Sequence, residues 1–288
     1  MKIGVTLPHA ATVDDPDRLR DFAQAVEGLG YDYILVYEHV VGVDPATRPG
    51  WSAPFTYKTP FHEPLTVLAY LAGVTQRIEF TSGIIILPQR QTVLFAKQAA
   101  EVDVLSKGRL RLGLGLGWNV VEFEALNEQF HNRGKRAEEQ IELMRLLWTQ
   151  ELVDFKGRYH RIDNAGINPL PVQRPIPIWM GAGADVALRR VARIADGFIG
   201  FFPAGIDPAP RIESFKAMVR EAGRDPAKVG VQASINVEEG GPAEWRQHLS
   251  RLNELGVSHV TVGEMTQDVG AQVARLRELK DAAGELAG

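Results

Sequence analysis

The clearest acid–base pair in this sequence is Glu38 and His39, which close the apolar run YDYILVYEH at residues 31–39. A carboxylate beside an imidazole suits proton transfer, because an ordinary histidine pKa of about 6.5 lets the ring give or take a proton at neutral pH. We therefore take both side chains as candidate catalytic groups. The sequence equally allows Glu38 a positioning role, in which its charge orients a backbone group or an arginine.

A second unusual feature is the stretch RLRLGLGLGW at residues 109–118. Side chains alternate between the two faces of a strand, so the leucines line one face while Gly113, Gly115 and Gly117 leave the other bare. Glycine inside a strand is costly, and a bare face beside Trp118 leaves a flat apolar cleft that suits a planar ring system. The alternative is that the glycines only relieve crowding or face helices.

A third feature is the segment Gly181–Ala182–Gly183, which follows an apolar run and precedes a helical pattern. Free N–H groups at a helix start, together with the helix dipole, make an anion site, and small residues let a phosphate approach the backbone. The motif is a weak one, since every helix needs some turn before it. The sequence contains neither a P-loop nor a G-x-G-x-x-G dinucleotide fingerprint.

Other common chemistries lack their residues. The absence of cysteine excludes disulfides and thiolate catalysis. No H-x-H pair is present, and His9 with His39 is too small a set to predict a metal site, so we expect no metal. No lysine ends a strand for a Schiff base, and no nucleophile elbow is present. A flat slot, a phosphate site and one or two titratable groups instead suit a large, planar, phosphorylated cofactor.

These groups are positioned by an alternation of apolar, β-branched runs with amphipathic helical stretches. The expected strands cover residues 2–8, 31–39, 77–87, 109–118, 176–181, 197–202, 229–237 and 258–263. The expected helices cover residues 15–30, 63–75, 92–108, 119–149 with a break near 131–134, 184–195, 209–223, 242–255 and 268–286.

Eight strand–helix units in 288 residues predict a (β/α)8 TIM barrel of the α/β class rather than an open Rossmann-type sheet. We expect a single domain over residues 1–288, with inserted segments at about 40–62 and 150–175. The second insertion carries a possible hairpin around Lys156–Gly157. In a barrel the active site lies at the carboxyl ends of the strands, where the candidate residues fall.

The composition sets the expected partners. The net charge is −4, with acidic and basic residues interspersed, so neither nucleic acid nor a membrane surface is expected. The first ten residues, MKIGVTLPHA, lack the apolar run of a signal peptide. We expect a cytoplasmic protein that acts on a small-molecule substrate.

The central part of the sequence resembles a known family. The run LPQRQTVLFAKQAAEVDVLSKGRLRLGLGLGWNVVEFEALNEQF, followed by RGKRAEEQIELMRLLW, is similar to the luciferase-like monooxygenase superfamily. It most resembles the branch of deazaflavin (coenzyme F420)-dependent oxidoreductases. RPIPIWMGAGADVALRRVARIADGF and YILVYEHVV resemble further parts of the same family. The resemblance implies a barrel with an inserted segment, a flavin or deazaflavin at its mouth, and usually a homodimer.

The resemblance also implies roles for individual residues. Gly83–Ile84 matches a non-prolyl cis peptide, a bulge that supports the middle ring of the cofactor. Gly117 and its neighbours, which include Gly115 and Trp118, match the strand end beside that ring. Gly181–Ala182–Gly183 matches the phosphate loop. His39 matches a histidine that serves as proton donor or ring contact in deazaflavin dehydrogenases.

Two departures from the family pattern bear on the substrate. The sugar-phosphate dehydrogenases of this branch carry a glutamate directly after the glycine that matches Gly117. This chain has Trp118 there, and its nearest carboxylate is Glu122, so sugar-phosphate oxidation is not expected. The family's second strand usually ends Asp-His, where this chain has Glu38–His39 and keeps the charge.

The function that follows is hydride transfer between bound coenzyme F420 and a small organic substrate, with His39 as the proton relay. Two alternatives stay open: an FMN-dependent monooxygenase that uses O2, and a non-catalytic flavin-binding barrel. The loop 45–62 is rich in aromatic residues and is expected either to cover the mouth as a lid or to pack on the barrel or a dimer partner.

Overall fold

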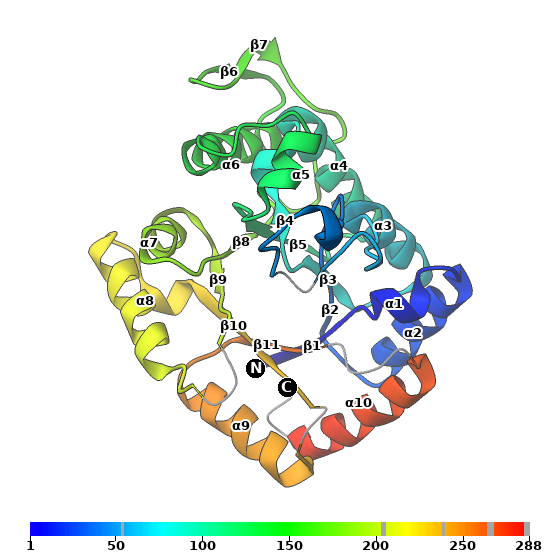
Figure 1. Ribbon diagram of the computed structural model, residues 1–288. Coiled ribbons are helices and arrows are strands. Elements are labelled where there is room, and N and C mark those ends of the chain that lie inside the picture. Colours follow the sequence, from blue (N-terminus) through cyan, green and yellow to red (C-terminus); the bar gives the residue numbers. More distant parts are fainter. Residues whose placement is uncertain (53–54, 203–205, 238–239, 264–267, 285–288) are drawn as a thin grey trace.

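The chain folds as a closed barrel of parallel strands surrounded by helices (Figure 1). The computed structural model describes residues 1–52, 55–202, 206–237, 240–263 and 268–284. In this part of the chain the barrel strands are β1 Lys2–Thr6, β2 Tyr33–Val36, β3 Glu79–Ser82, β4 Ile85–Ile86, β5 Leu110–Gly115, β8 Ile178–Gly181, β9 Gly197–Ile199, β10 Gly230–Ile235 and β11 His259–Val262.

Closure distinguishes this fold from a Rossmann-type sheet. The strand order is β3-β2-β1-β11-β10-β9-β8-β5-β4, and β3 also pairs with β5, which joins the two ends. Every barrel pairing is parallel, from β1 with β11 to β8 with β9. Because β3 and β4 occupy one position in the barrel, the described residues supply eight strand positions, and the TIM-barrel prediction is confirmed.

Helices follow the strands around the outside of the barrel (Figure 1). They are α1 His9–Thr12, α2 Pro16–Gly28, α3 Pro64–Val74, α4 Thr92–Leu105, α5 Val120–Ala125, α6 Arg133–Thr149, α7 Asp185–Ile194, α8 Ala209–Glu221, α9 Pro242–Glu254 and α10 Val269–Ala283, with single 3-10 turns at Pro45–Thr47, Leu87–Gln89 and Pro226–Lys228. The break expected near residues 131–134 is the gap between α5 and α6. The last two residues of the helix expected at 268–286 lie outside the described part of the chain.

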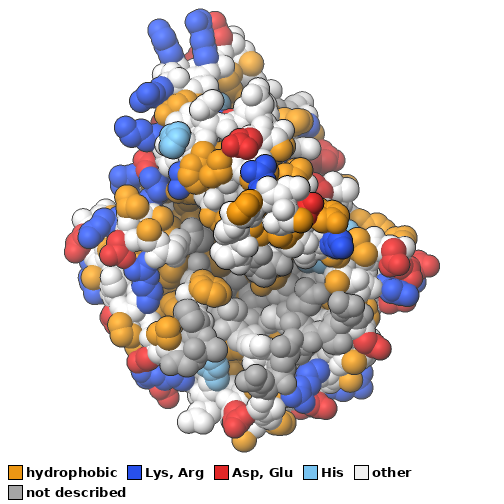
Figure 2. All heavy atoms as spheres, viewed as in Figure 1, with side chains coloured by type: hydrophobic (Ala, Val, Ile, Leu, Met, Phe, Trp, Pro, Cys, Tyr) orange, Lys and Arg blue, Asp and Glu red, His pale blue; other side chains and the backbone are white. Residues whose placement is uncertain are grey.

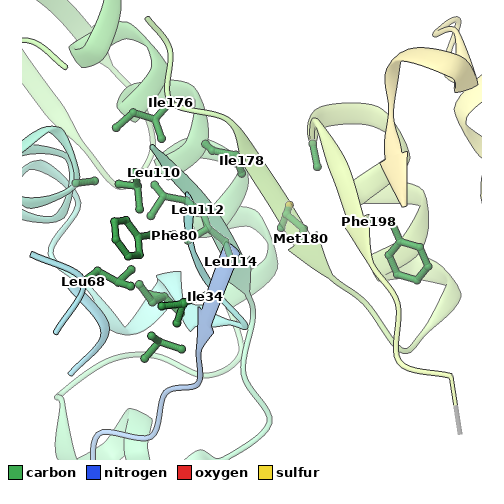
Figure 3. Close-up of a cluster of buried hydrophobic side chains, with 14 of the residues drawn as sticks. Ile34, Leu68, Phe80, Leu110, Leu112, Leu114, Ile176, Ile178, Met180 and Phe198 are labelled. Carbon is green, nitrogen blue, oxygen red and sulfur yellow. The ribbon is translucent and has the colours of Figure 1, made fainter. Parts of the chain in front are cut away.

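The main core lies between the strands and the helices. The leucine face of β5 points into it: Leu110, Leu112 and Leu114 are fully buried and cluster with Phe80 of β3 and Leu68 of α3 (Figure 3). Burying one leucine side chain contributes about 1.5–3 kcal/mol, so this face anchors β5 to the helical layer. The alternation of leucine and glycine therefore fixes which face of β5 looks into the barrel.

The second insertion forms an antiparallel hairpin of β6 Val153–Lys156 and β7 Arg161–Ala165, as the sequence suggested. It projects beyond the helices at one end of the molecule, where Lys and Arg side chains gather (Figures 1 and 2). One carboxylate holds it: Glu139 of α6 accepts backbone hydrogen bonds from Arg158, Tyr159 and His160. The segment is thus tied to the barrel and does not interrupt it.

Two expectations about strands are corrected. The strand expected at residues 77–87 is divided into β3 and β4, because the chain bulges at Gly83–Ile84. The strand expected at 109–118 ends at Gly115. Gly117 has φ +76°, a left-handed conformation that favours glycine, so it turns the chain away from the sheet and is not part of the bare strand face.

The bare face of β5 is also not an open cleft. A Cβ on Gly113 would lie 1.8 Å from the carbonyl oxygen of Ser82, and a Cβ on Gly115 would lie 1.8 Å from Cδ1 of Ile84. Ser82 Oγ also bridges to Gly113, donating to its carbonyl at 2.7 Å and accepting from its N–H at 3.1 Å. The two glycines make room for the β3–β4 bulge, which itself fills the space that the sequence had suggested for a ring.

This close approach predicts a stability effect. Gly113→Ala is expected to lower the free energy of unfolding by about 1–3 kcal/mol, the usual cost of overpacking a core, because the obstructing atom is backbone. Urea denaturation followed by circular dichroism measures the change. Gly183→Ala is the matched control, since no atom lies within 4 Å of its added Cβ. Equal midpoints for the two variants would contradict the packing described here.

Candidate active site

The most reactive arrangement at the mouth of the barrel is a histidine–carboxylate pair. His39 follows β2, and its Nδ1 lies 3.0 Å from Oε1 of Glu122 in α5. The same oxygen accepts the backbone N–H of Val40 at 3.0 Å. The Glu122 side chain is 2% exposed and that of His39 is 16% exposed. Glu122 thus fixes the orientation of the imidazole ring. Because its carboxylate accepts a hydrogen bond from the Nδ1–H group, the proton stays on Nδ1 and Nε2 is left to interact with other groups.

Local sequence explains why Glu122 reaches the histidine. Asn119 caps α5, because its side-chain oxygen accepts the N–H of Val121 at 3.1 Å. Glu122 therefore stands in the first turn of the helix, where a carboxylate is favoured by the helix dipole. Burial alone would raise the pKa of Glu122, but the hydrogen bonds from His39 and Val40 outweigh it and hold that pKa below its ordinary value. The group is an anion at neutral pH.

Glu38, the other candidate acid–base residue, makes contacts that position the chain. Its carboxylate accepts the N–H of Ile86 at 2.6 Å and forms an ion pair with Arg90, which also binds Glu63 at 3.0 Å. Burial raises the pKa of Glu38, against the opposing effect of Arg90. With its oxygens engaged by β4 and Arg90, Glu38 ties the end of β2 to the chain just after the bulge. These contacts match the positioning alternative.

The bulge itself has the expected geometry. The peptide bond between Gly83 and Ile84 is cis, which confirms the conformation that the family resemblance implied. The Ile84 side chain lies next to the positions of Gly115 and Gly181, since a Cβ on either glycine would be 1.8 Å or 3.2 Å from its Cδ1. The structure thus brings the candidate cofactor residues of three strands together at one side of the mouth.

A partly open cavity of about 170 Å³ adjoins His39. Its walls come from the segment after β2, from the first insertion and from the start of α5, and are lined by His39, Val40, Val41, Gly42, Val43, Trp51, Phe55, Thr56, Tyr57, Thr59, Phe61, Trp118 and Asn119. The His39 ring contacts Phe55 and Phe61, with ring centroids 4.9 Å apart in each case, and Trp118 at 6.0 Å. The first insertion therefore lies over the histidine, as a lid would.

The other aromatic and histidine residues near the mouth differ from His39 in their exposure and in the groups that they contact. Trp118 is 52% exposed and packs on Trp51, whereas Phe201 is 81% exposed and Phe202 packs on Phe198. His9 is buried, and its Nε2 accepts a hydrogen bond from the backbone N–H of Tyr37 at 3.2 Å. Burial and the nearby His62 lower the pKa of His9 to about 3, so it is neutral at physiological pH.

The loop Gly181–Ala182–Gly183 leads from β8 into α7, as expected. Ala184 caps α7 without a side-chain hydrogen bond, and Gly183 is exposed with no atom within 4 Å of an added Cβ. A cation also lies there: Arg211 of α8 donates to the Gly183 carbonyl and to Asp185, each at 2.5 Å. An open helix start beside a guanidinium offers N–H donors and positive charge, which favour an anion such as a phosphate.

Sequence reasoning missed several of these partners. Glu122 was noted only as the nearest carboxylate and Trp51 only as part of the aromatic loop 45–62, whereas Arg90 and Arg211 carried no signal of their own. The i,i+3 relation of Glu122 to the capping residue Asn119 was the one local clue, because it puts a carboxylate in the first turn of a helix at a strand end. Among the described helices, none is both long and apolar enough to cross a bilayer.

Comparison with known proteins places this architecture in a family. The luciferase-like monooxygenase family model matches residues 1–251. An uncharacterised protein of Mycobacterium tuberculosis is 33% identical over 250 residues, which cover 84% of this chain and 83% of that protein. A solved F420-dependent secondary alcohol dehydrogenase, in complex with an F420-acetone adduct, has the same fold, with a TM-score of 0.77, 16% identity and 99% of each chain covered.

Two named relatives use different cofactors. The F420-dependent glucose-6-phosphate dehydrogenase of Segniliparus rotundus is 32% identical over 214 residues, which cover 69% of this chain and 58% of that enzyme. The FMNH2-dependent dimethylsulfone monooxygenase of Pseudomonas fluorescens is 29% identical over 254 residues, which cover 84% of this chain and 64% of that enzyme. The family thus includes F420-dependent and FMN-dependent oxidoreductases, and with a family model that spans most of its length, this chain belongs to the luciferase-like monooxygenase family.

Proposed function

We propose that this protein is an oxidoreductase that transfers a hydride between bound coenzyme F420 and a small organic substrate. The observation that carries the proposal is the His39–Glu122 pair beside a cavity at the carboxyl ends of the barrel strands. Hydride transfer to or from a carbon that bears oxygen requires a proton to leave or reach that oxygen. A histidine oriented by a buried carboxylate, with one ring nitrogen left over, meets this need.

The residues of the mouth fit a deazaflavin. Gly83 and Ile84 would bear the ring system, with Gly115, Gly117 and Trp118 beside it, and Gly181, Ala182 and Gly183 would hold the phosphate. When bound, the deazaflavin supplies the hydride acceptor or donor. The uncapped start of α7 and the neighbouring Arg211 support phosphate binding at this loop. Glu38 would keep the bulge in place through the N–H of Ile86.

The chain's own part in the reaction is to hold and move one proton and to exclude water. Glu122 keeps the proton on Nδ1 of His39, so that Nε2 accepts a proton from a substrate hydroxyl or, as imidazolium, donates one to a carbonyl oxygen. Phe55 and Phe61 of the first insertion cover the His39 ring and limit the exchange of its proton with solvent. Both directions of hydride transfer use the same pair.

Cofactor binding tests the proposal. Titration of the purified protein with F420 and with FMN, followed by tryptophan fluorescence, is expected to show micromolar affinity for F420 and at least tenfold weaker affinity for FMN, a difference of about 1.4 kcal/mol. Preferential FMN binding with substrate-dependent oxygen uptake would establish the monooxygenase alternative. Tight binding of either cofactor without turnover of any alcohol or carbonyl compound would favour a non-catalytic barrel.

A variant of the phosphate loop locates the cofactor. Gly183→Val is expected to raise the F420 dissociation constant at least tenfold, because its side chain occupies the space that a phosphate needs, while the barrel stays folded. Gly28→Val, at the end of α2, is the matched control: it too has no atom within 4 Å of an added Cβ. An unchanged affinity in folded Gly183→Val would move the phosphate to another part of the mouth.

A further inference from the structure

A buried positive charge lies inside the barrel, below its mouth. Arg111 of β5 stands between Leu110 and Leu112, which face the outer core, so its side chain points into the barrel, and the residue is 7% exposed. A buried charge is costly, and proteins normally pair it with an opposite charge. The His39–Glu122 pair and the bulge do not use this cation.

No carboxylate compensates the charge of Arg111 within the described part of the chain. Its Nη1 donates to Oε1 of Gln232 at 3.0 Å, and its Nη2 is buried without an acceptor there. The carboxylate whose charge acts on Arg111 is Glu79, and Glu79 is itself paired with Lys2 at 2.5 Å. The guanidinium therefore keeps an uncompensated charge in the interior of the barrel.

Two aromatic rings enclose the guanidinium. Its Cζ lies 4.3 Å from the ring centroid of Trp179 and 5.1 Å from that of Tyr33. These contacts stabilise the cation but do not remove its charge. The rings also fill the space around it: a Cβ on Gly197 would lie 2.2 Å from the Trp179 ring, and a Cβ on Gly4 would lie 2.3 Å from the Tyr33 ring. An inorganic anion from solution has little room on this side of Arg111.

The nearest histidine adds no charge of its own. The His259 ring contacts Trp179, with centroids 4.6 Å apart. Burial, together with the charges of Arg111, Lys2 and the N-terminal amine, lowers the pKa of His259 to about 3. His259 is therefore neutral at physiological pH, and Arg111 supplies the charge of this layer.

The layer directly above Arg111 is open to solvent. The inner face of β10 carries Gln232, which binds Arg111, and then Ser234, while the alternate residues of the strand pack in the outer core. Ser234 is exposed, and two residues of a strand span about 7 Å. At about 10 Å and an effective dielectric constant of about 20, a unit charge shifts the equilibrium of another charged group about tenfold. The charge of Arg111 thus acts on groups in the mouth.

We propose that Arg111 makes the floor of the mouth electropositive and favours the more negative form of a group that binds above it. Applied to the cofactor, the inference rests on the function proposed above. Hydride transfer from a substrate carbon would bring an electron pair and one negative charge to the bound deazaflavin. Arg111 would then strengthen the binding of reduced F420 relative to oxidised F420, whereas a guanidinium that only packs in the core would affect both forms alike.

An introduced thiol measures this charge effect without any cofactor. The chain contains no cysteine, so Ser234→Cys supplies a single thiol in the layer above Arg111. A nearby cation favours the thiolate, so its pKa is expected to lie below the ordinary value of about 8.5 and to rise by about one unit when Arg111→Met is added. The pH dependence of the rate of alkylation by iodoacetamide gives the pKa.

Two further variants control this measurement. Arg111→Lys keeps the charge, so the low thiol pKa is expected to persist. Arg189→Met removes an equal charge from α7, where the Arg189 side chain is 62% exposed, and is expected to leave the thiol pKa unchanged. Circular dichroism checks that each variant is folded, and Arg111→Gln is the second neutral variant if Arg111→Met does not fold.

Anaerobic titration with oxidised and with reduced F420, followed by tryptophan fluorescence, tests the consequence for the cofactor. In Arg111→Met, reduced F420 is expected to lose about tenfold more affinity than oxidised F420, and Arg111→Lys is expected to stay close to wild type. A tenfold change in this ratio corresponds to a fall of about 30 mV in the two-electron potential of the bound cofactor.

The outcomes separate this inference from the proposed function. An unchanged thiol pKa after Arg111→Met overturns the inference, whether or not F420 binds. A shifted thiol pKa in a protein that binds no F420 supports the electropositive floor and overturns the function. A shifted thiol pKa with equal losses of affinity for both forms of F420 supports the floor and overturns its effect on the cofactor.

Discussion

Replacing His39 by asparagine is expected to lower kcat for alcohol oxidation by the F420-loaded protein by about 10²- to 10⁴-fold, the usual contribution of a positioned acid–base group. Asparagine can still reach Glu122 but cannot carry a proton at neutral pH. The dissociation constant of F420 is expected to change little, because the barrel bulge and phosphate loop are untouched. Stopped-flow absorbance of the cofactor gives the rate, and fluorescence titration gives the affinity.

Glu122→Gln separates the two members of the pair. Loss of the carboxylate removes the charge that orients the His39 ring and stabilises its protonated form, so the maximum rate is expected to drop, but by less than in His39→Asn. Glu63→Gln is the control, since that carboxylate binds Arg90 and does not contact His39. A normal rate in His39→Asn, or an unchanged rate in Glu122→Gln, would assign proton transfer to another group.

Lowering the pH from 7 to 5 is expected to remove about 2 kcal/mol of unfolding free energy through His9 alone. Burial and His62 lower its pKa in the folded protein from 6.5 to about 3. Between these values the unfolded chain binds a proton that the folded chain does not, so stability is present above about pH 6.5 and is lost as the pH falls. His259, whose pKa is also lowered to about 3 by burial and by the charge of Arg111, acts in the same direction.

Urea denaturation at several pH values measures this effect. In His9→Gln the loss between pH 7 and pH 5 is expected to shrink by about 2 kcal/mol, even if the variant is less stable at pH 7. Carboxylates such as Glu122 and Glu139, whose pKa values are lowered, add losses only below their ordinary value of 4.5 and do not affect this comparison. An identical pH dependence in wild type and His9→Gln would show that His9 titrates normally.

The sequence by itself was sufficient for the architecture. Eight apolar runs separated by amphipathic stretches predicted the barrel, because parallel strands buried on both faces leave a hydrophobic signal that is local and repeated. The Leu–Gly alternation of residues 110–115 correctly predicted that the leucine face of this strand packs in the core. The same pattern put His39 and the loop Gly181–Gly183 at the ends of two strands, and the fold places all strand ends at one mouth.

Tertiary structure decided which groups meet at that mouth. Glu122 lies 83 positions from His39 along the chain, and no local pattern encodes their contact. From the sequence, Glu38 was open to a catalytic or a positioning role, and its contacts in the structure are the Ile86 N–H and Arg90, 48 and 52 positions away. The bare face of β5 suggested either room for a ring or relief of crowding, and in the structure Ser82 and Ile84 of the neighbouring bulge pack against it. Periodicity reports which way a side chain points, but the atom that it meets depends on segments joined only when the barrel closes.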